Sequence, residues 1–139
     1  MKKIIKNLKE TELLALNFAS TLKKGDVVLL SGDLGAGKTT FTQYVFKSLG
    51  VEEVVNSPTF SVLKSYQAKE LTLHHFDVYR ITTEEAIECG FDEVLSDRNS
   101  IIFIEWADNI KALLPKTYWK VEIKLISSAR EFLIEKVEE

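Results

Sequence analysis

Several residue types are scarce in this chain of 139 residues. The single cysteine, Cys89, excludes an internal disulfide and is typical of a protein from a reducing compartment, so we expect a cytoplasmic location. With two prolines and six glycines the chain has no low-complexity linker, so we expect one domain over residues 1–139. No apolar run exceeds four residues, whereas a membrane-spanning helix needs about 20. The basic N-terminus is not followed by a long apolar run, so we expect neither a signal peptide nor a membrane partner.

Positive charge is also limited. Lysine and arginine together number 18 against 21 acidic residues, and the net charge is −3. This balance argues against a whole-surface electrostatic grip on nucleic acid. Only three arginines are present, Arg80, Arg98 and Arg130, and none has an obvious context for stabilising a transition state, so we expect slow turnover without a partner.

Helical and strand patterns alternate along the chain. Apolar residues at helical spacing follow Thr11, which we expect to cap that helix, and a second helix is predicted over residues 38–49. Buried strands are predicted at residues 26–31 and 101–104, strand pairs at 60–66 with 71–76 and at 119–126 with 131–137, and short helices from residues 82 and 108. The sequence therefore predicts an α/β fold with a mixed sheet: a parallel core, antiparallel hairpins at the edges and flanking helices, like that of P-loop NTPases.

Residues 32–39, with the sequence GDLGAGKT, fit the phosphate-loop pattern G-x-x-x-x-G-K-[ST] at every fixed position. The pattern stands between a buried strand and a helix, as it does in nucleotide-binding proteins. Glycines let the backbone wrap closely around phosphate oxygens, and the helix N-terminus adds positive charge. The predicted phosphate ligands are the amides of Gly35, Ala36, Gly37 and Lys38, the Lys38 ammonium and the Thr40 hydroxyl, while the Thr39 hydroxyl would bind Mg²⁺.

Two acidic residues end predicted strands. Glu105 follows an apolar run in the position of a Walker B carboxylate, and Asp77 ends the strand that contains His74 and His75. Because ligands of parallel sheets gather at the carboxyl ends of strands, either acid could hold Mg²⁺ or position the attacking water. The simpler alternatives are a solvated Glu105 and an Asp77 paired with Arg80.

Two further features are weaker. His74 and His75 are adjacent on a strand and point to opposite faces, so they cannot chelate one ion together. Trp106, directly after Glu105, is either a buried aromatic residue or a contact for a partner or a substrate.

The class of nucleotide-binding protein can be narrowed further. The chain lacks the [NT]-K-x-D string that reads guanine and the D-x-x-G string of a switch segment. We therefore expect an adenine nucleotide, ATP or ADP, or weak discrimination of the base, with Mg²⁺ at the phosphates. A small-molecule kinase needs an acceptor pocket and a basic lid, whereas this chain offers an acid-rich helix near residues 84–88.

Four strings, in their order and spacing, resemble the TsaE (YjeE) family: L-G-A-G-K-T-T at residues 34–40, S-P-T-F at 57–60, H-F-D-V-Y-R at 75–80 and I-E-W at 104–106. The resemblance covers about residues 11–130. It implies a bacterial ATPase required for threonylcarbamoyladenosine modification of tRNA at position 37, working with the TsaD and TsaB proteins and reaching tRNA indirectly through them.

The resemblance also implies roles for individual residues. Lys38, Asp77 and Glu105 would be catalytic, with Thr39 and Glu105 as Mg²⁺ ligands and Asp77 assisting at the metal or the water. Thr11 and Arg130 would approach the adenine. Ser57, Pro58, Thr59, Phe60 and Trp106 would form a switch or partner surface. Two other functions stay open: a binding module in which the nucleotide only orders the partner surface, and, less favoured, a small-molecule kinase.

Overall fold

The computed structural model describes residues 1–33, 35–55, 63–79 and 81–138. Its strands are β1 (Lys2–Ile5), β2 (Val27–Gly32), β3 (Leu63–Ala68), β4 (Leu71–Asp77), β5 (Ser100–Glu105), β6 (Thr117–Ile126) and β7 (Ala129–Glu138). The helices are α1 (Leu8–Thr21), α2 (Lys38–Ser48), α3 (Thr83–Glu88), α4 (Phe91–Leu95) and the 3₁₀ helix η1 (Ala107–Leu113).

The strands form one sheet in the order β1-β7-β6-β2-β5-β4-β3. The pairs β6–β2, β2–β5 and β5–β4 are parallel, while β1–β7, β7–β6 and β4–β3 are antiparallel. This arrangement confirms the predicted mixed sheet, with its parallel core and its hairpins at both edges. The carboxyl ends of β2, β4 and β5 consequently lie along one side of the sheet.

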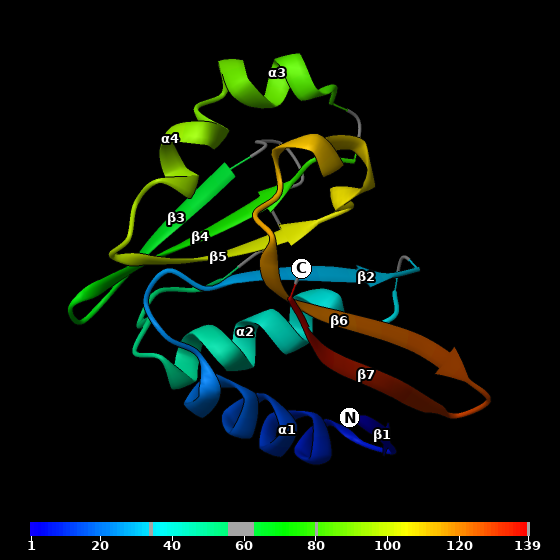
Figure 1. Cartoon of the computed structure of the whole chain (residues 1–139). Coiled ribbons are helices and arrows are strands. Elements are labelled where there is room, and N and C mark those ends of the chain that lie inside the picture. Colours follow the sequence, from blue (N-terminus) through cyan, green and yellow to red (C-terminus); the bar gives the residue numbers. More distant parts are fainter. Residues whose placement is uncertain (34, 56–62, 80, 139) are drawn as a thin grey trace.

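Helices cover both faces of the sheet (Figure 1). On one face, α1 and α2 pack against β2, β5 and β6 through a core that includes Phe18, Phe41 and Phe46. On the other face, α3, α4 and η1 pack through a second core that includes Phe91 and Ile110. Alternation along each strand explains this division, because Val28 and Leu30 belong to the first core whereas Val27 and Leu29 belong to the second.

The start of α1 differs from the prediction. Its N-cap is Asn7, whose side-chain oxygen accepts from the amide of Glu10 at 2.9 Å. Thr11 lies one turn inside the helix and is buried. The helix begins at Leu8, which is exposed, so the pattern of buried residues does not mark the first turn.

Two other elements were not predicted. The strand β1 is short and mostly exposed, and it is defined by pairing with β7, with Lys2 opposite Leu133. The helix α4 follows Gly90, whose φ of +88° lets the chain turn after α3. The expected strand 60–66 is described only from Leu63 onward, and the predicted roles of Ser57, Pro58, Thr59, Phe60 and Arg80 lie outside the described residues.

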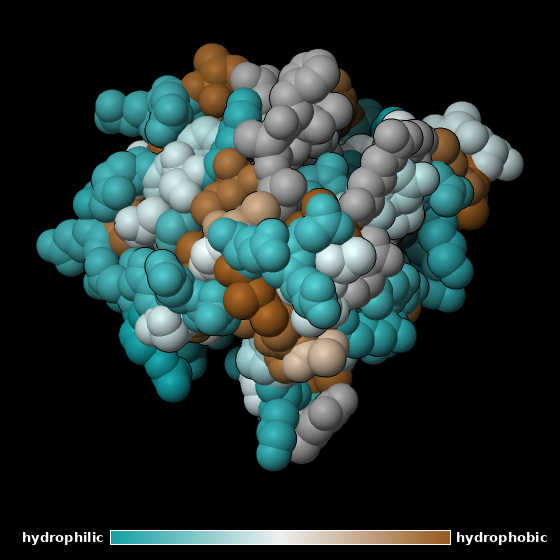
Figure 2. All heavy atoms as spheres, turned by 90° about the horizontal axis from the view of Figure 1, so that it is seen from above, coloured by the Kyte–Doolittle hydropathy of each residue, from teal (hydrophilic) through white to brown (hydrophobic). Residues whose placement is uncertain are grey.

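The surface carries mixed polarity. Seen from above, hydrophilic side chains cover much of the visible face, and apolar side chains form smaller groups between them (Figure 2). Within the described ranges, no helix is both long and apolar enough to cross a membrane.

Candidate functional site

The predicted phosphate loop joins β2 to α2. Gly35 and Gly37 have φ values of +81° and +110°, which L side chains rarely adopt. Gly37 is also the N-cap of α2, so no side chain caps the first amides of this helix. The amide of Ala36, one of the predicted phosphate donors, donates to the carbonyl of Asp33 at 3.0 Å and is therefore used within the loop here. The start of α2, without a side-chain cap, can offer its first backbone amides to an anion.

Lys38, the first residue of α2, is almost fully buried. Its Nζ lies 3.7 Å from Oε1 of Glu105 and 4.1 Å from the centroid of the Trp106 ring. A buried ammonium needs such compensation, and here a carboxylate and an indole face both provide it. The structure thus brings together three residues that the sequence singled out separately.

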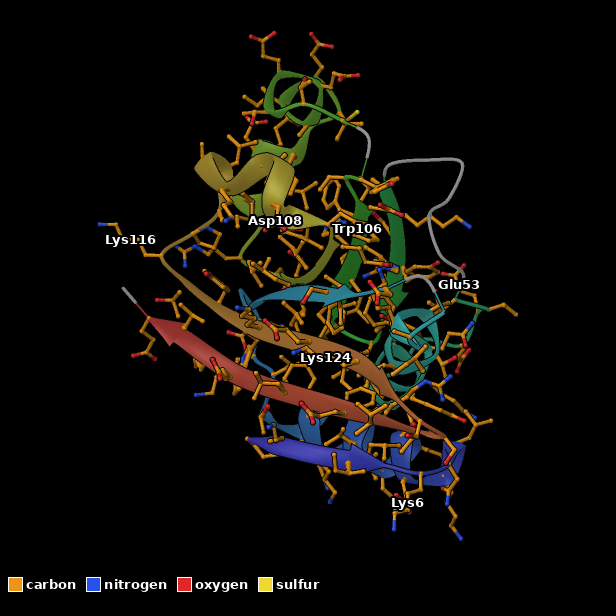
Figure 3. All side chains as sticks on the ribbon, turned by 90° about the vertical axis from the view of Figure 1, so that its right-hand side faces the viewer. Lys6, Glu53, Trp106, Asp108, Lys116 and Lys124 are labelled. Carbon is orange, nitrogen blue, oxygen red and sulfur yellow. The ribbon has the colours of Figure 1, made fainter. Side chains whose placement is uncertain are left out.

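Trp106 stands in an unusual backbone conformation. Its φ and ψ of +62° and +39° are left-handed, which costs about 1–3 kcal/mol for a bulky residue. This conformation turns the chain from β5 into η1 at Trp106 (Figure 3). The half-buried indole lies over Nζ of Lys38. The exposed ring of Tyr79 packs against the indole at a centroid distance of 4.8 Å. Trp106 is therefore neither fully buried nor an isolated surface residue.

The two predicted carboxylates end neighbouring parallel strands, with Asp77 in register with Glu105. Glu105 is buried, which excludes the solvated alternative. Asp77 is half-buried, and its Oδ1 accepts from the amide of Tyr79 at 3.1 Å. Burial is the main cause that raises the pKa of Asp77; the bond from Tyr79 opposes the rise and the charge of Glu105 adds to it.

The two histidines lie on opposite faces of β4, as predicted. His74 contacts Ser65 Oγ through Nδ1 at 2.8 Å, and its Nε2 lies 3.6 Å from Asp97. His75 lies on the Glu105 side, with Nε2 2.6 Å from Oε2 of Glu105. Sequence reasoning considered the pair only as metal ligands and missed the contact between His75 and Glu105. Parallel strand register and alternation along β4 are the signals that could have revealed it.

Thr11 and Arg130 are far apart in sequence and meet beside the loop. Together with Leu8, Gly37, Thr40 and Phe132 they line one small pocket. A Cβ added to Gly37 would lie 3.3 Å from Nε of Arg130. That Nε atom is buried and has no hydrogen-bond partner within the described part of the chain. The structure thus places both residues next to the start of α2.

Thr39 lies in the first turn of α2 and is half-buried. Its hydroxyl and the carboxylates of Asp77 and Glu105 are all hard oxygen donors, the type that Mg²⁺ prefers. Among the described residues, no group of three or more His, Cys, Asp and Glu residues is placed to hold a metal ion. These oxygen donors fit Mg²⁺, which proteins hold through one or two carboxylates together with phosphate and water.

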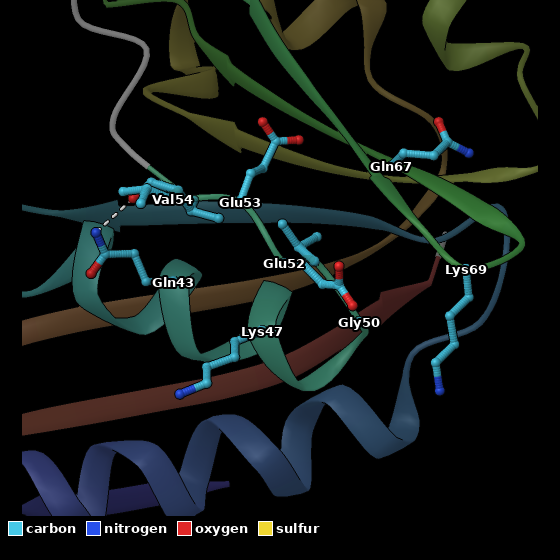
Figure 4. Close-up of a pocket in the computed structure, with 10 residues that line it drawn as sticks. Gln43, Lys47, Gly50, Glu52, Glu53, Val54, Gln67 and Lys69 are labelled. Atoms are coloured by element: carbon cyan, nitrogen blue, oxygen red, sulfur yellow. Dashed lines mark hydrogen bonds between the residues drawn. The ribbon is translucent and has the colours of Figure 1, made fainter.

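A larger open pocket lies elsewhere, between the second half of α2 and the β3–β4 hairpin (Figure 4). Gln43, Lys47, Gln67 and Lys69 line it together with residues 50–55. Gln43 closes one end by donating to the carbonyl of Val55 at 2.6 Å. None of the described residues that the sequence predicts for the site lines this pocket.

Known proteins match the chain over most of its length. A family model described as "Threonylcarbamoyl adenosine biosynthesis protein TsaE" matches residues 5–132. A protein named "tRNA threonylcarbamoyladenosine biosynthesis protein TsaE" from Rickettsia felis is 41% identical over 125 residues, covering 88% of this chain and 72% of that protein. Its namesake from Bacillus subtilis is 42% identical over 118 residues, covering 85% and 73%.

A solved structure agrees with these matches. The "Crystal structure of Bacillus subtilus YdiB" superposes with a TM-score of 0.82 and 34% identity, over 100% of this chain and 86% of that one. The matched residues 5–132 contain the loop at 35–40 as well as Asp77, Glu105, Trp106 and Arg130. This chain belongs to the TsaE family.

Proposed function

We propose that this chain is an Mg²⁺-dependent ATP-binding and ATP-hydrolysing subunit required for threonylcarbamoyladenosine biosynthesis in tRNA. The family membership supports the pathway, since the relatives named above carry it in their names. One observation supports the chemistry most strongly. Lys38, at the uncapped start of α2, shares a buried ion pair with Glu105 at the carboxyl end of β5. The residue that we propose binds phosphate and the acid that we propose binds the metal thus lie side by side.

Phosphate binding falls to the loop and the start of α2. The amides of Gly35, Gly37 and Lys38, with the helix N-terminus, would bind the phosphate oxygens. The Lys38 ammonium would leave the Trp106 face and Glu105 for the terminal phosphates. Thr40 would contact the α-phosphate, and Thr11 with Arg130 would approach the adenine. The unpaired Nε of Arg130 beside Gly37 supports this placement.

Thr39, Glu105 and Asp77 would hold Mg²⁺, which supplies charge neutralisation at the phosphates. Glu105 is the stronger candidate for the metal, because Lys38 and His75 already fix its carboxylate. Asp77 is half-buried with a raised pKa, so it is suited to accept a proton from the attacking water. Lys38 and the loop amides would stabilise the charge that develops during transfer.

The subunit would act on its partners rather than on tRNA directly. The net charge of −3 offers no whole-surface grip on tRNA, so TsaD and TsaB would carry that contact. Trp106 and the exposed Tyr79 pack together beside Lys38, where a change in the nucleotide can reach the surface. We include Ser57, Pro58, Thr59 and Phe60 in this switch surface on the family resemblance.

Equilibrium binding of ATP tests the site. We expect Lys38→Met, which keeps the unbranched side chain, to weaken ATP binding at least tenfold with and without Mg²⁺. Thr39→Val keeps the shape but removes the hydroxyl, and we expect it to weaken binding only when Mg²⁺ is present. Thermal melting of both variants checks that they are folded. Wild-type affinity in Lys38→Met would refute the assignment of the phosphate loop.

The alternative is a binding module in which hydrolysis is incidental. The contact of Lys38 with Trp106 favours the binding module. If Lys38 moves to a bound nucleotide, the indole is released before any hydrolysis. A tRNA-modification assay with TsaD and TsaB separates the two functions. Full modification with a non-hydrolysable ATP analogue supports the module, whereas modification only with ATP supports the ATPase.

A further inference from the structure

His75 is a fully buried polar side chain in the middle of β4. Its Nε2 lies 2.6 Å from Oε2 of Glu105, a short hydrogen bond inside the protein. Neither residue is exposed enough to exchange this bond for one with water. The contact is therefore a fixed part of the fold beside the proposed site.

The register of the sheet explains the contact. β4 and β5 are parallel, with His75 opposite Phe103 and Asp77 opposite Glu105. Residues two apart share a face, so these four side chains all point to the α2 side of the sheet. From there the imidazole contacts Glu105, which lies two residues beyond Phe103, the register partner of His75 in β5.

Aromatic packing holds the imidazole in place. The ring of Phe46, from α2, lies 6.1 Å from the His75 ring at an interplanar angle of 76°. Phe46 also packs edge-to-face on Phe103 at 5.1 Å and on Tyr66 at 5.6 Å. This packing of Phe46 and the burial of the His75 ring restrict its rotamers and keep Nε2 directed at Glu105.

The two oxygens of Glu105 have different partners. Oε1 lies 3.7 Å from Nζ of Lys38, and Oε2 faces His75. Nδ1 of His75 is buried without a hydrogen-bond partner among the described residues. The tautomer with its hydrogen on Nε2 satisfies this arrangement, since it donates to Oε2 and leaves no buried donor unpaired at Nδ1.

We propose that His75 is a positioning residue for Glu105. Its Nε2–H holds Oε2 and thereby keeps Oε1 turned toward Lys38 and the phosphate loop, where Mg²⁺ would bind. His75 itself touches neither the nucleotide nor the metal. The proposal rests on the proposed function only in taking Glu105 as a metal ligand.

The test compares ATP affinity with and without Mg²⁺ in four variants. His75→Phe keeps the aromatic volume and removes the donor to Glu105. We expect the increase in ATP affinity caused by Mg²⁺ to be about 10- to 100-fold smaller in this variant, the usual effect of removing a residue that holds a metal ligand. Affinity without Mg²⁺ should stay within about threefold, since the loop amides and Lys38 are unchanged. His75→Gln, whose amide nitrogen can replace Nε2, should restore most of the gain. His74→Gln is the matched control on the opposite face and should resemble the wild type.

Glu105→Gln separates the positioning role of His75 from the metal-binding role of Glu105. If it loses the gain from Mg²⁺ but His75→Phe does not, the positioning role is overturned and the metal role stands. If neither loses it, both are overturned. Nitrogen NMR of the nucleotide-free wild type adds a readout that needs no variant to fold. We expect a protonated Nε2 and an unprotonated Nδ1 in His75, and the opposite tautomer would overturn the proposal.

Discussion

The end of β2 requires glycine at position 32 because of one carbonyl oxygen. A Cβ added to Gly32 would lie 2.6 Å from the backbone oxygen of Ile123 in β6, and its φ is +150°. β2 and β6 are parallel neighbours here, so neither strand can retreat without breaking the ladder. Gly32, the first glycine of the phosphate-loop pattern, is therefore required by the contact between β2 and β6 as well as by the loop.

We expect Gly32→Ala to lower the free energy of unfolding by about 2 kcal/mol or more, since it adds a steric clash to backbone strain. Gly25→Ala is the matched control: Gly25 has a φ of +94°, but a Cβ added there would meet nothing within 4 Å. Strain alone should cost about 1 kcal/mol there. Urea denaturation measures both, and equal losses would contradict the role given to the Ile123 carbonyl.

Asp77 is costly to ionise in the folded protein, because burial raises its pKa above the ordinary value of 3.8. The folded state then holds the proton more tightly than the unfolded state. The contribution of Asp77 to stability is fully present below pH 3.8 and is lost as the pH rises through the raised pKa. We expect Asp77→Asn to be more stable than the wild type at pH 7, with a difference that shrinks near pH 3.8.

Denaturant unfolding of this pair at several pH values checks the expectation. The asparagine keeps an oxygen that can accept from the Tyr79 amide, so the comparison isolates the charge. A variant less stable than the wild type at pH 7 would contradict it. A gain in stability combined with weaker Mg²⁺-dependent ATP binding would show that the site keeps an unfavourable charge for function.

The helix α1 depends on its first turn. Asn7 accepts from the amide of Glu10, and Oε1 of Glu10 accepts from the amide of Lys6 at 3.0 Å. Thr11 follows within this turn, so the cap also fixes one wall of the small pocket beside Gly37.

We expect Asn7→Ala to lower the free energy of unfolding by about 1 kcal/mol, the usual cost of losing an N-cap. Asn17→Ala makes the same substitution on the exposed side of the helix interior, where alanine favours the helix by a few tenths of a kcal/mol. Thermal unfolding compares the two. Similar effects of both substitutions would show that the cap does not stabilise the helix.

Elements with strong local patterns could be predicted from the sequence. The buried strands β2 and β5 and the helix α2 agree closely in position. The β3–β4 hairpin was also predicted, but β3 continues to Ala68, two residues beyond the expected end. The strand β1 could not, because its exposed residues form a strand only through pairing with β7. The predicted cap at Thr11 was wrong because Asn7, one turn earlier, caps the helix through the amide of Glu10.

The candidate site was predictable in its parts but not in its connections. Local strings identified Lys38, Asp77, Glu105 and Trp106 one at a time. The bond between His75 and Glu105 depends on strand order, since it joins residues of β4 and β5 that are adjacent only in the folded sheet. The left-handed backbone of Trp106, which sets its ring over Lys38, has no local signal either.

At the scale of the whole molecule, the two cores on opposite faces of the sheet make stability sensitive to groups buried between the layers. His74 lies on the face opposite the site, beside Ser65 and Asp97. Burial lowers its pKa below the ordinary 6.5, although the carboxylate of Asp97, 3.6 Å from Nε2, opposes the shift. The protein should therefore lose stability as pH falls from 6.5 through the lowered pKa.

Melting temperatures measured between about pH 7.5 and 5 test this loss of stability. This range brackets the ordinary histidine pKa of 6.5. We expect a smaller decline in His74→Gln, which lacks the titrating ring. An identical decline in both proteins would assign the acid sensitivity to other groups.

The central claim is that Lys38 and Glu105 make this chain an ATPase within the tRNA-modification machinery. Phosphate release from ATP in the presence of Mg²⁺, TsaD and TsaB tests it most directly, with Glu105→Gln beside the wild type. We predict release by the wild type that rises when the partners are added, and a loss of about 100-fold or more in the variant. Release that is absent with the partners present, or equal in the two proteins, would contradict the claim.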